Sequence, residues 1–433
     1  MANFHVRWCG ALAAALSLSI GVFAQDPQSG DPKQRIKAVR EYAKQGASGV
    51  ESLRRMLHDA DSAVRVEAVK GLVEVGGSGV LEPLMEATRD NDPQVQMRAT
   101  DGLVNFYLPG YVQQGRFEKI GSALKSPFSD KNDAIIPSYV TVREDVLQAI
   151  GKLVSGGGST DVRANAARAL GILRGKAALP VLVEALRSKD TDVLAEALLA
   201  IQKIRDPSVG PKLAPLFNDL SERVQTTAIE TAGLLRSKET LPDLRRVYAK
   251  SGKARVQRTV LTAIGNMPDE QDRPLFEKAL EDQKDENLRA AGAEGLGRLG
   301  NRADIGKLQP LFNSERKMKP RLAIAFAVVK LGATETSEFS PLQYLSNTLN
   351  SKLYTGVAEG YLVELARDPQ VRENLYPLIP KGTRAEKMGL ARVLSVSGDK
   401  SGVAPLEALT RDSDGEVAES GLRALKVLKA RLP

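Results

Sequence analysis

The chain has 433 residues, of which 42% are apolar and 26% charged, and its formal net charge at pH 7 is +8. These proportions are typical of globular proteins and exclude an intrinsically disordered chain. Aromatic residues make up only 5%, which disfavours a β-sandwich or a nucleotide-binding enzyme and indicates helices rich in alanine, leucine and valine.

The first 24 residues differ from the rest. His5 and Arg7 supply a short basic start, and residues 11–22 then carry no charge. Val22-Phe23-Ala24 has the small-x-small pattern that signal peptidases cut, and the apolar run is too short to span a bilayer. We therefore expect residues 1–24 to be a secretory signal that is removed after Ala24, and the mature protein to be periplasmic or secreted. The alternative is a buried N-terminal helix.

Removal of the signal would change which reactive side chains the mature protein contains. Cys9 and Trp8, the only residues of their types, leave with the signal, and one histidine, His58, remains. Without a thiol, the exported chain must be stabilised by packing rather than by disulfides. Residues 25–48 then form an N-terminal tail and a capping helix.

A repeated pattern occupies most of the mature chain. Residues 61–76, 161–175 and 287–300 each begin with an apolar residue near an arginine, continue with a small residue, and end in a Leu-x-x-Leu/Val-Gly-like pattern. We call the first apolar residue of each unit its anchor. The anchors are Val64, Val95, Val162, Val193, Val224, Val256, Leu288, Pro320, Leu353, Ala385 and Val417. They are 31 to 33 residues apart, except for one interval of 67 residues that equals about two periods with a small insertion.

Each unit predicts a pair of helices. Before an anchor runs an apolar stretch such as residues 179–187, with leucines at helical spacing. Turn and N-cap residues follow, for example Asp61 or Asp92, and a second helix then ends at glycines such as Gly76 or Gly300. One pair cannot bury its apolar face alone, whereas a stack can. The sequence therefore predicts an all-α, right-handed α-solenoid.

These units resemble the HEAT-like repeats, especially the short bacterial type also found in phycobilin lyases. The resemblance covers residues 49–433 and predicts regular repeats at 49–105 and 142–338, with atypical and C-terminal repeats at 339–433. It implies a scaffold or binding surface, although a few members of the family are lyases or nucleic-acid enzymes.

Residues 106–141 interrupt the pattern with prolines and six aromatic residues. Aromatic side chains anchor many protein interfaces, so this insertion is a candidate partner site. The alternative is that the rings fill a gap left by a missing or bent helix. The candidate contact residues are Tyr107, Tyr111, Phe117, Phe128 and Tyr139.

A second group of aromatic residues keeps the period. It includes Phe339, Tyr344, Tyr354, Tyr361 and Tyr376. Because the repeat continues through this segment, we expect these rings to pack between atypical helices rather than to form a separate site.

Basic residues gather in one part of the chain and form a candidate basic patch, which consists of Arg245, Arg246, Lys250, Lys253, Arg255 and Arg258. Aligned in a stack, such residues can attract an anionic polymer or nucleic acid; the alternative is an ordinary solvated face. A second set, Arg65, Arg163, Arg289 and Arg321, shares one position of the repeat and predicts a ladder of helix-end and aspartate contacts.

The sequence contains few groups suited to catalysis. One mature histidine excludes a zinc site that needs two, and His58 is placed to cap a helix end. No nucleophile elbow, zinc-protease or P-loop motif is present. We therefore expect no catalytic residues, cofactor, metal site, small-molecule substrate or membrane span. The predicted function is an exported, non-enzymatic scaffold for a protein partner, with polyanion binding or a HEAT-like lyase activity as alternatives.

Overall fold

The computed structural model describes residues 29–112, 134–137 and 139–432, and in these residues every regular element is a helix. The predicted signal and the candidates Phe117 and Phe128 lie outside the described residues. The chain divides into two compact units, residues 1–80 and residues 81–433.

In the described residues 29–80, the first unit contains one α-helix followed by one helix pair. Its α-helices are α1 (Pro32–Lys44), α2 (Val50–Met56) and α3 (Ser62–Val75). Helix α1 packs against both members of the pair, and Leu53, Val64 and Leu72 are buried.

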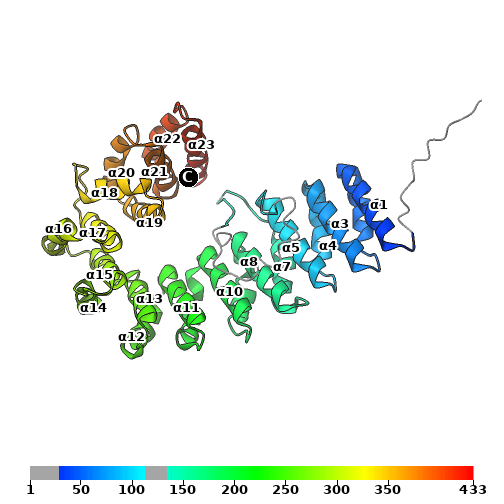
Figure 1. Cartoon of the computed structure of the whole chain (residues 1–433), viewed down its shortest axis with the longest axis horizontal. Helices are drawn as coiled ribbons and strands as arrows, with labels where there is room; N and C mark the ends of the chain where they lie inside the picture. Colours follow the sequence, from blue (N-terminus) through cyan, green and yellow to red (C-terminus); the bar gives the residue numbers. More distant parts are fainter. Residues whose placement is uncertain (1–28, 113–133, 138, 433) are drawn as a thin grey trace, which may run out of the picture. The chain divides into compact units, whose positions relative to one another are not determined.

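The second unit continues the pairs. The first members are α4 (Leu81–Ala87), α7 (Glu144–Gly156), α9 (Leu179–Ala185), the 3-10 helix η5 (Pro207–Asn218), α12 (Leu241–Lys250), α14 (Arg273–Leu280), α16 (Ile305–Ser314), α18 (Pro341–Asn347), α20 (Pro369–Leu375) and α22 (Val403–Leu409). The second members are α5 (Pro93–Tyr107), α8 (Thr160–Ile172), α10 (Thr191–Ile204), α11 (Glu222–Leu235), α13 (Ala254–Gly265), α15 (Glu286–Leu299), α17 (Met318–Lys330), α19 (Thr355–Leu365), α21 (Arg384–Ser397) and α23 (Gly415–Lys429). Consecutive second helices lie side by side (Figure 1). The predicted all-α solenoid of helix pairs is confirmed.

The 67-residue interval between two anchors contains fewer helix pairs than the sequence suggested. Helix α5 packs directly against α8, and α4 against α7. The interval therefore holds one repeat and a long insertion, and the interpretation as two periods with a small insertion was wrong. Periodicity alone could not distinguish the two, because an insertion of about one repeat length preserves the phase.

Most second helices begin at a side-chain cap, as predicted. The side chains of Asp61, Asp92, Asp190, Asp285 and Asp414 accept hydrogen bonds from backbone N–H groups in the first turn. Each such cap stabilises a helix by about 1 kcal/mol.

In several pairs, the residue after the anchor closes the turn between the two helices. Gln96 Nε2 donates to the carbonyl oxygen of Asp90 at 2.6 Å, and equivalent bonds link Gln225 to Phe217 and Gln257 to Ser251. Arg65 and Arg289 do the same with the carbonyls of Asp59 and Asp282, each at 2.9 Å. The predicted helix-end contacts are thus confirmed for these two arginines.

The other two arginines of that set depart from the prediction. Arg163 donates to the hydroxyl of Thr160, within its own helix. The Arg321 guanidinium lies against two neighbouring aromatic rings instead. The ladder therefore does not run through every repeat.

Neighbouring second helices approach closely at glycines. A Cβ atom on Gly171, Gly233 or Gly297 would lie 2.7, 2.7 and 2.6 Å from the Cα of Ala200, Ala263 and Ala327, respectively. Such separations are shorter than carbon–carbon van der Waals contact. The stack therefore needs a residue without a side chain at this position of these repeats.

Candidate partner-binding surface

The second helices carry two rows of side chains on one side of the stack. The rows lie six and ten residues after each anchor, and we call them the second-helix surface. From α5 to α17 the first row is Asp101, Arg168, Leu199, Glu230, Thr262, Glu294 and Phe326, and the second is Asn105, Ile172, Lys203, Leu234, Asn266, Arg298 and Lys330.

Buried polar residues fill this surface at α5, α8 and α10. Asn165 Nδ2 donates to Asp101 Oδ1 at 3.0 Å, and Arg168 forms two hydrogen bonds to Glu196, at 2.7 and 3.2 Å. Glu196 is only 1% exposed. We call these four residues the Glu196 cluster. A carboxylate buried this deeply needs its partner, because an unpaired buried charge costs several kcal/mol.

Tyr111, from the insertion, lies over this cluster. Burial raises the pKa of its phenol, and the nearby carboxylates of Asp101 and Glu196 raise it further, against the opposing charge of Arg168. The hydroxyl therefore stays neutral at physiological pH. Its position beside the cluster fits the interpretation of the aromatic residues as gap-filling rings, although Tyr111 is only partly buried.

The other described parts of the insertion also contact the helix stack. The Ile136 N–H donates to the carbonyl oxygen of Ile172 at 3.0 Å, and Lys203 Nζ donates to the carbonyl of Ala134 at 3.3 Å. This segment therefore lies against the C-terminal ends of α8 and α10.

The three described candidate aromatics are not gathered into one exposed patch. The Tyr107 hydroxyl accepts a hydrogen bond from the Arg143 N–H at 3.2 Å. Tyr139 is 41% exposed, and the Lys426 ammonium group lies 4.5 Å from its ring centroid. Of the three, Tyr139 alone offers substantial surface to a partner.

A second buried cluster closes the same surface at α15, α17 and α19. Arg298 Nη2 and Nε bind Glu364 at 3.0 to 3.2 Å, and Nη1 binds Glu294 at 3.0 Å. The Tyr361 hydroxyl donates to Glu294 Oε1 at 2.5 Å, and its ring stacks on Phe326 at 4.7 Å. We call these five residues the Arg298 cluster. It links α15 to α19 across the intervening α17.

Electrostatics keep Glu364 ionised and Tyr361 neutral. Burial raises the pKa of Glu364, but the hydrogen bonds and charge of Arg298 outweigh burial and leave that pKa below its usual value. Burial and the carboxylate of Glu294 hold the pKa of Tyr361 well above its ordinary value. Tyr361 is therefore a hydrogen-bond donor here and not a base.

Helix α17 is consequently covered on all sides. Every residue from Leu322 to Val329 is buried, with Phe326 at 0% exposure beneath the Arg298 guanidinium, 4.8 Å from its ring centroid. A helix that is apolar all round must be enclosed by its neighbours. The expected ring packing in the atypical repeats is confirmed for Tyr361, and also for Tyr344, whose ring meets Phe312 edge-on at 5.4 Å.

Between the two clusters, α11 and α13 leave the second-helix surface open. Leu234 is 42% exposed, and Glu230 and Thr262 are also exposed. The surrounding protein partly desolvates the Glu230 carboxyl and raises its pKa, although Arg255 opposes this effect. An apolar side chain and a partly desolvated carboxylate, both accessible to a partner, thus lie one helical turn apart on α11.

The candidate basic patch is largely neutralised within the described residues. Arg245 binds Asp272 through two hydrogen bonds of 2.8 Å, and Arg258 binds Asp285 at 2.5 Å. Lys253 and Arg255 both approach Glu222, at 3.5 and 3.9 Å. Arg246 pairs with Asp243 at 2.7 Å, and Lys250 ends α12.

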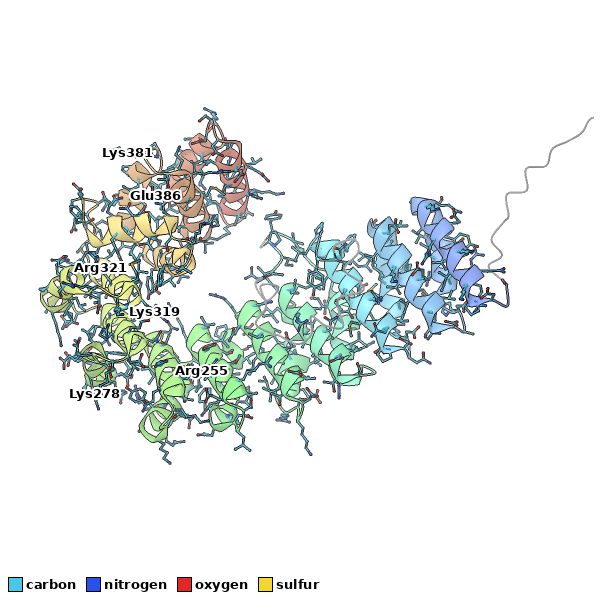
Figure 2. The ribbon with its side chains drawn as sticks, viewed as in Figure 1. Arg255, Lys278, Lys319, Arg321, Lys381 and Glu386 are labelled. Carbon is cyan, nitrogen blue, oxygen red and sulfur yellow. The ribbon has the colours of Figure 1, made fainter. Side chains whose placement is uncertain are left out.

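Most of these carboxylates belong to the preceding or following repeat. The cations therefore act mainly as links between repeats, each exposed pair stabilising the stack by at most about 1 kcal/mol. Figure 2 marks Arg255 at the start of α13. Nothing in this arrangement favours a polyanion over a protein partner.

The part of the chain that the structure describes offers neither a metal-binding cluster nor a membrane-spanning helix. No cluster of three or more histidine, cysteine, aspartate or glutamate side chains there could hold a metal ion. No described helix combines the length and the apolar character that crossing a bilayer requires.

Comparison with known proteins identifies the repeat. The family of HEAT repeats matches residues 26–104, 147–231, 182–255, 210–297 and 249–328, which together cover more than half of the chain. No curated protein sequence matches the chain.

Several solved structures are similar at low identity. The complex of CpcE and CpcF of phycocyanin lyase from Nostoc sp. PCC7120 is 16% identical, with 58% of this chain and 94% of that chain covered and a TM-score of 0.34. Importin beta is 15% identical over 93% of this chain and 66% of that one, with a TM-score of 0.40. Kap121p is 12% identical over 92% and 48%, with a TM-score of 0.42. With the helix pairs and the family match together, this chain belongs to the HEAT-repeat family, whose solenoids commonly serve as scaffolds for protein interaction.

Proposed function

We propose that this protein is an exported, non-enzymatic scaffold that holds a protein partner on the open part of its second-helix surface, at α11 and α13. The observation that carries this proposal is the exposed Leu234 beside Glu230, between two stretches where the same surface is covered. A partner segment with an apolar side chain next to a lysine or arginine fits this pair.

The energetics of binding favour such a segment. Covering Leu234 removes apolar area from water, and each Å² of apolar area buried favours binding by about 25 cal/mol. A partner cation beside Glu230 stabilises a carboxylate that the protein already desolvates. Both gains arise at one contact, which is the usual organisation of an interface hot spot.

The chemistry of the surface supports binding rather than catalysis. Tyr111 and Tyr361 have pKa values raised above the ordinary value for a phenol. Glu196 and Glu364 are each held by an arginine. Tyr111 and Tyr361 therefore stay protonated and Glu364 stays ionised, so these three groups do not exchange a proton at neutral pH.

Export is part of the proposal and rests on the N-terminal sequence pattern. The test is N-terminal sequencing of protein recovered from the periplasm or medium of its host, which should begin at Gln25. Retention of Met1 to Ala24, with the protein recovered only from the cytoplasm, contradicts export without affecting the proposed binding surface.

Site-specific crosslinking tests the surface. A photoreactive amino acid at Leu234 should trap one partner that mass spectrometry can identify, whereas the same group at Leu422, which is 60% exposed on α23, should not. The partner, once purified, should bind the Leu234→Asp variant at least about tenfold more weakly, as expected for loss of a hot-spot side chain, and should bind Leu422→Asp normally. Equal trapping at both positions, or undiminished binding by Leu234→Asp, contradicts the proposal.

A further inference from the structure

Arg321 differs from the residues that close the turn within a helix pair from the same position. At the equivalent position, Arg289 donates to the carbonyl of Asp282 and to Glu315 Oε2, the latter at 3.0 Å. Gln225 and Gln257 likewise bind the end of their first helix. Arg321 makes neither kind of bond, and among the residues that the structure describes no acceptor contacts its guanidinium.

Two aromatic rings hold the guanidinium in place. Its carbon lies 4.9 Å from the ring centroid of Phe312 on α16 and 4.7 Å from that of Tyr344 on α18. The Tyr344 hydroxyl is fixed by a 3.2 Å contact to the sulfur of Met318. Arginine stacked in this way keeps its planar fork oriented, so less conformational entropy is lost when the fork binds a ligand.

The fork is only partly enclosed. The Nε atom of Arg321 is buried without a partner. The two Nη groups, in contrast, remain in contact with water. Guanidinium N–H groups left facing solvent in a fixed plane match the two oxygens of a carboxylate or phosphoryl group.

The surroundings are positively charged. The N-cap residue of α17, Lys317, makes no side-chain cap, whereas Asp285 caps the preceding second helix. The nearest acidic residue in sequence, Glu315, already accepts from Arg289 and from the Lys317 N–H. Figure 2 marks Lys319 and Arg321 on this first turn of α17.

We infer that Arg321 is the receptor of an oxyanion site at the start of α17, where its two Nη groups bind a carboxylate or phosphoryl group. The site lies apart from the Leu234 surface, and neither proposal depends on the other. The oxyanion comes either from a free anion such as phosphate or from an acidic side chain of a protein.

Calorimetric titration of the full mature chain tests the site, with inorganic phosphate in one arm and a tetraglutamate peptide in the other, each at the same ionic strength. We expect binding in at least one arm, and Arg321→Gln should weaken it by on the order of tenfold or more, because charge-assisted hydrogen bonds are lost. Arg321→Lys should recover only part of the affinity, since lysine keeps the charge but not the fork. Arg423→Gln removes an exposed arginine on α23 that pairs with Glu419 and should change nothing.

Circular dichroism at 222 nm must first show that each variant is folded. Tyr344→Leu provides a further variant, which leaves all the charges in place. That variant should also bind more weakly, because one of the two stacking rings is gone. Phosphate binding identifies a free anion as sufficient, and binding of the peptide alone identifies a protein carboxylate. Equal affinity of wild type and Arg321→Gln, or no measurable binding in either arm, overturns the inference.

Discussion

The Glu196 cluster and the Arg298 cluster close the same side of the helix stack by different means. At α5, α8 and α10 the cover includes Tyr111, which comes from an insertion between repeats. At α15, α17 and α19 every contributing side chain belongs to a repeat helix, and Arg298 reaches over α17 to Glu364. A repeat array can therefore cover its surface either with an inserted segment or with side chains of its own repeat helices. The surface at α11 and α13 has neither kind of cover and remains open.

The largest effect should come from removing the central cation of each cluster. Arg298→Met leaves Glu294 and Glu364 without their shared partner, and Arg168→Met leaves the nearly inaccessible Glu196 without its own. Each should lower the free energy of unfolding by about 3–5 kcal/mol, measured as a lower urea midpoint.

Arg423→Met provides the matched control for both. It breaks an ion pair to Glu419 in which both side chains are more than 60% exposed, so it should change the free energy of unfolding by less than about 0.5 kcal/mol. A loss at Arg298 no larger than this control would show that the cluster does not stabilise the fold.

The next effect concerns the close approach of second helices in both regions. Gly171→Ala and Gly297→Ala should each destabilise the protein by about 1–3 kcal/mol, because the new methyl group meets the backbone of Ala200 or Ala327. Gly360→Ala, on α19 with no atom near the added carbon, should instead stabilise by about 0.5–1 kcal/mol. Thermal unfolding distinguishes the signs, and stabilisation by all three would contradict the packing.

A smaller effect is expected in the pH dependence of the Arg298 cluster. The pKa of Glu364 is lowered in the folded protein from the ordinary value of 4.5, so its contribution to stability is fully present above that pH. The contribution is lost as pH falls through the folded pKa. Glu364→Gln should therefore flatten the decline in stability below pH 4.5. An unchanged acid limb of the stability curve would argue against the pairing with Arg298.

In the open stretch, the pH dependence of stability should have the opposite sign, and its effect should be the smallest of those considered. Because the folded pKa of Glu230 is raised, the protein binds a proton there more readily than the unfolded chain does. Wild-type stability thus gains a small contribution as pH falls through that raised pKa. Glu230→Gln should remove this gain and slightly raise the unfolding midpoint at pH 7; a lowered midpoint would show that Glu230 has a stabilising partner.

The regular part of the fold could be predicted because its causes are local. Anchors at a steady spacing and aspartates such as Asp61 and Asp92 specify helix starts within a few residues of themselves. The partners of the basic residues were missed, although they follow a simple rule. Asp272 and Asp285 both lie 27 residues after their partners Arg245 and Arg258, in the next repeat, and this shared spacing is the signal that was overlooked.

The two clusters could not be predicted in the same way. Glu364 is 66 residues from Arg298 and two second helices away, and no repeat pattern couples positions across an intervening unit. Tyr111 reaches the Glu196 cluster from an insertion that has no period at all. Side chains that meet through the path of the whole chain, and not through its periodicity, leave no local signal.

The span of Arg298 over α17 also has a consequence for cooperativity. In an array where each repeat touches only its two neighbours, unfolding can begin at one unit and spread stepwise. Bonds from α15 to α19 couple next-nearest units, since neither end can open without breaking contacts to the other. These three repeats should consequently melt as a single block, while arrays joined only between neighbours can lose their repeats one at a time.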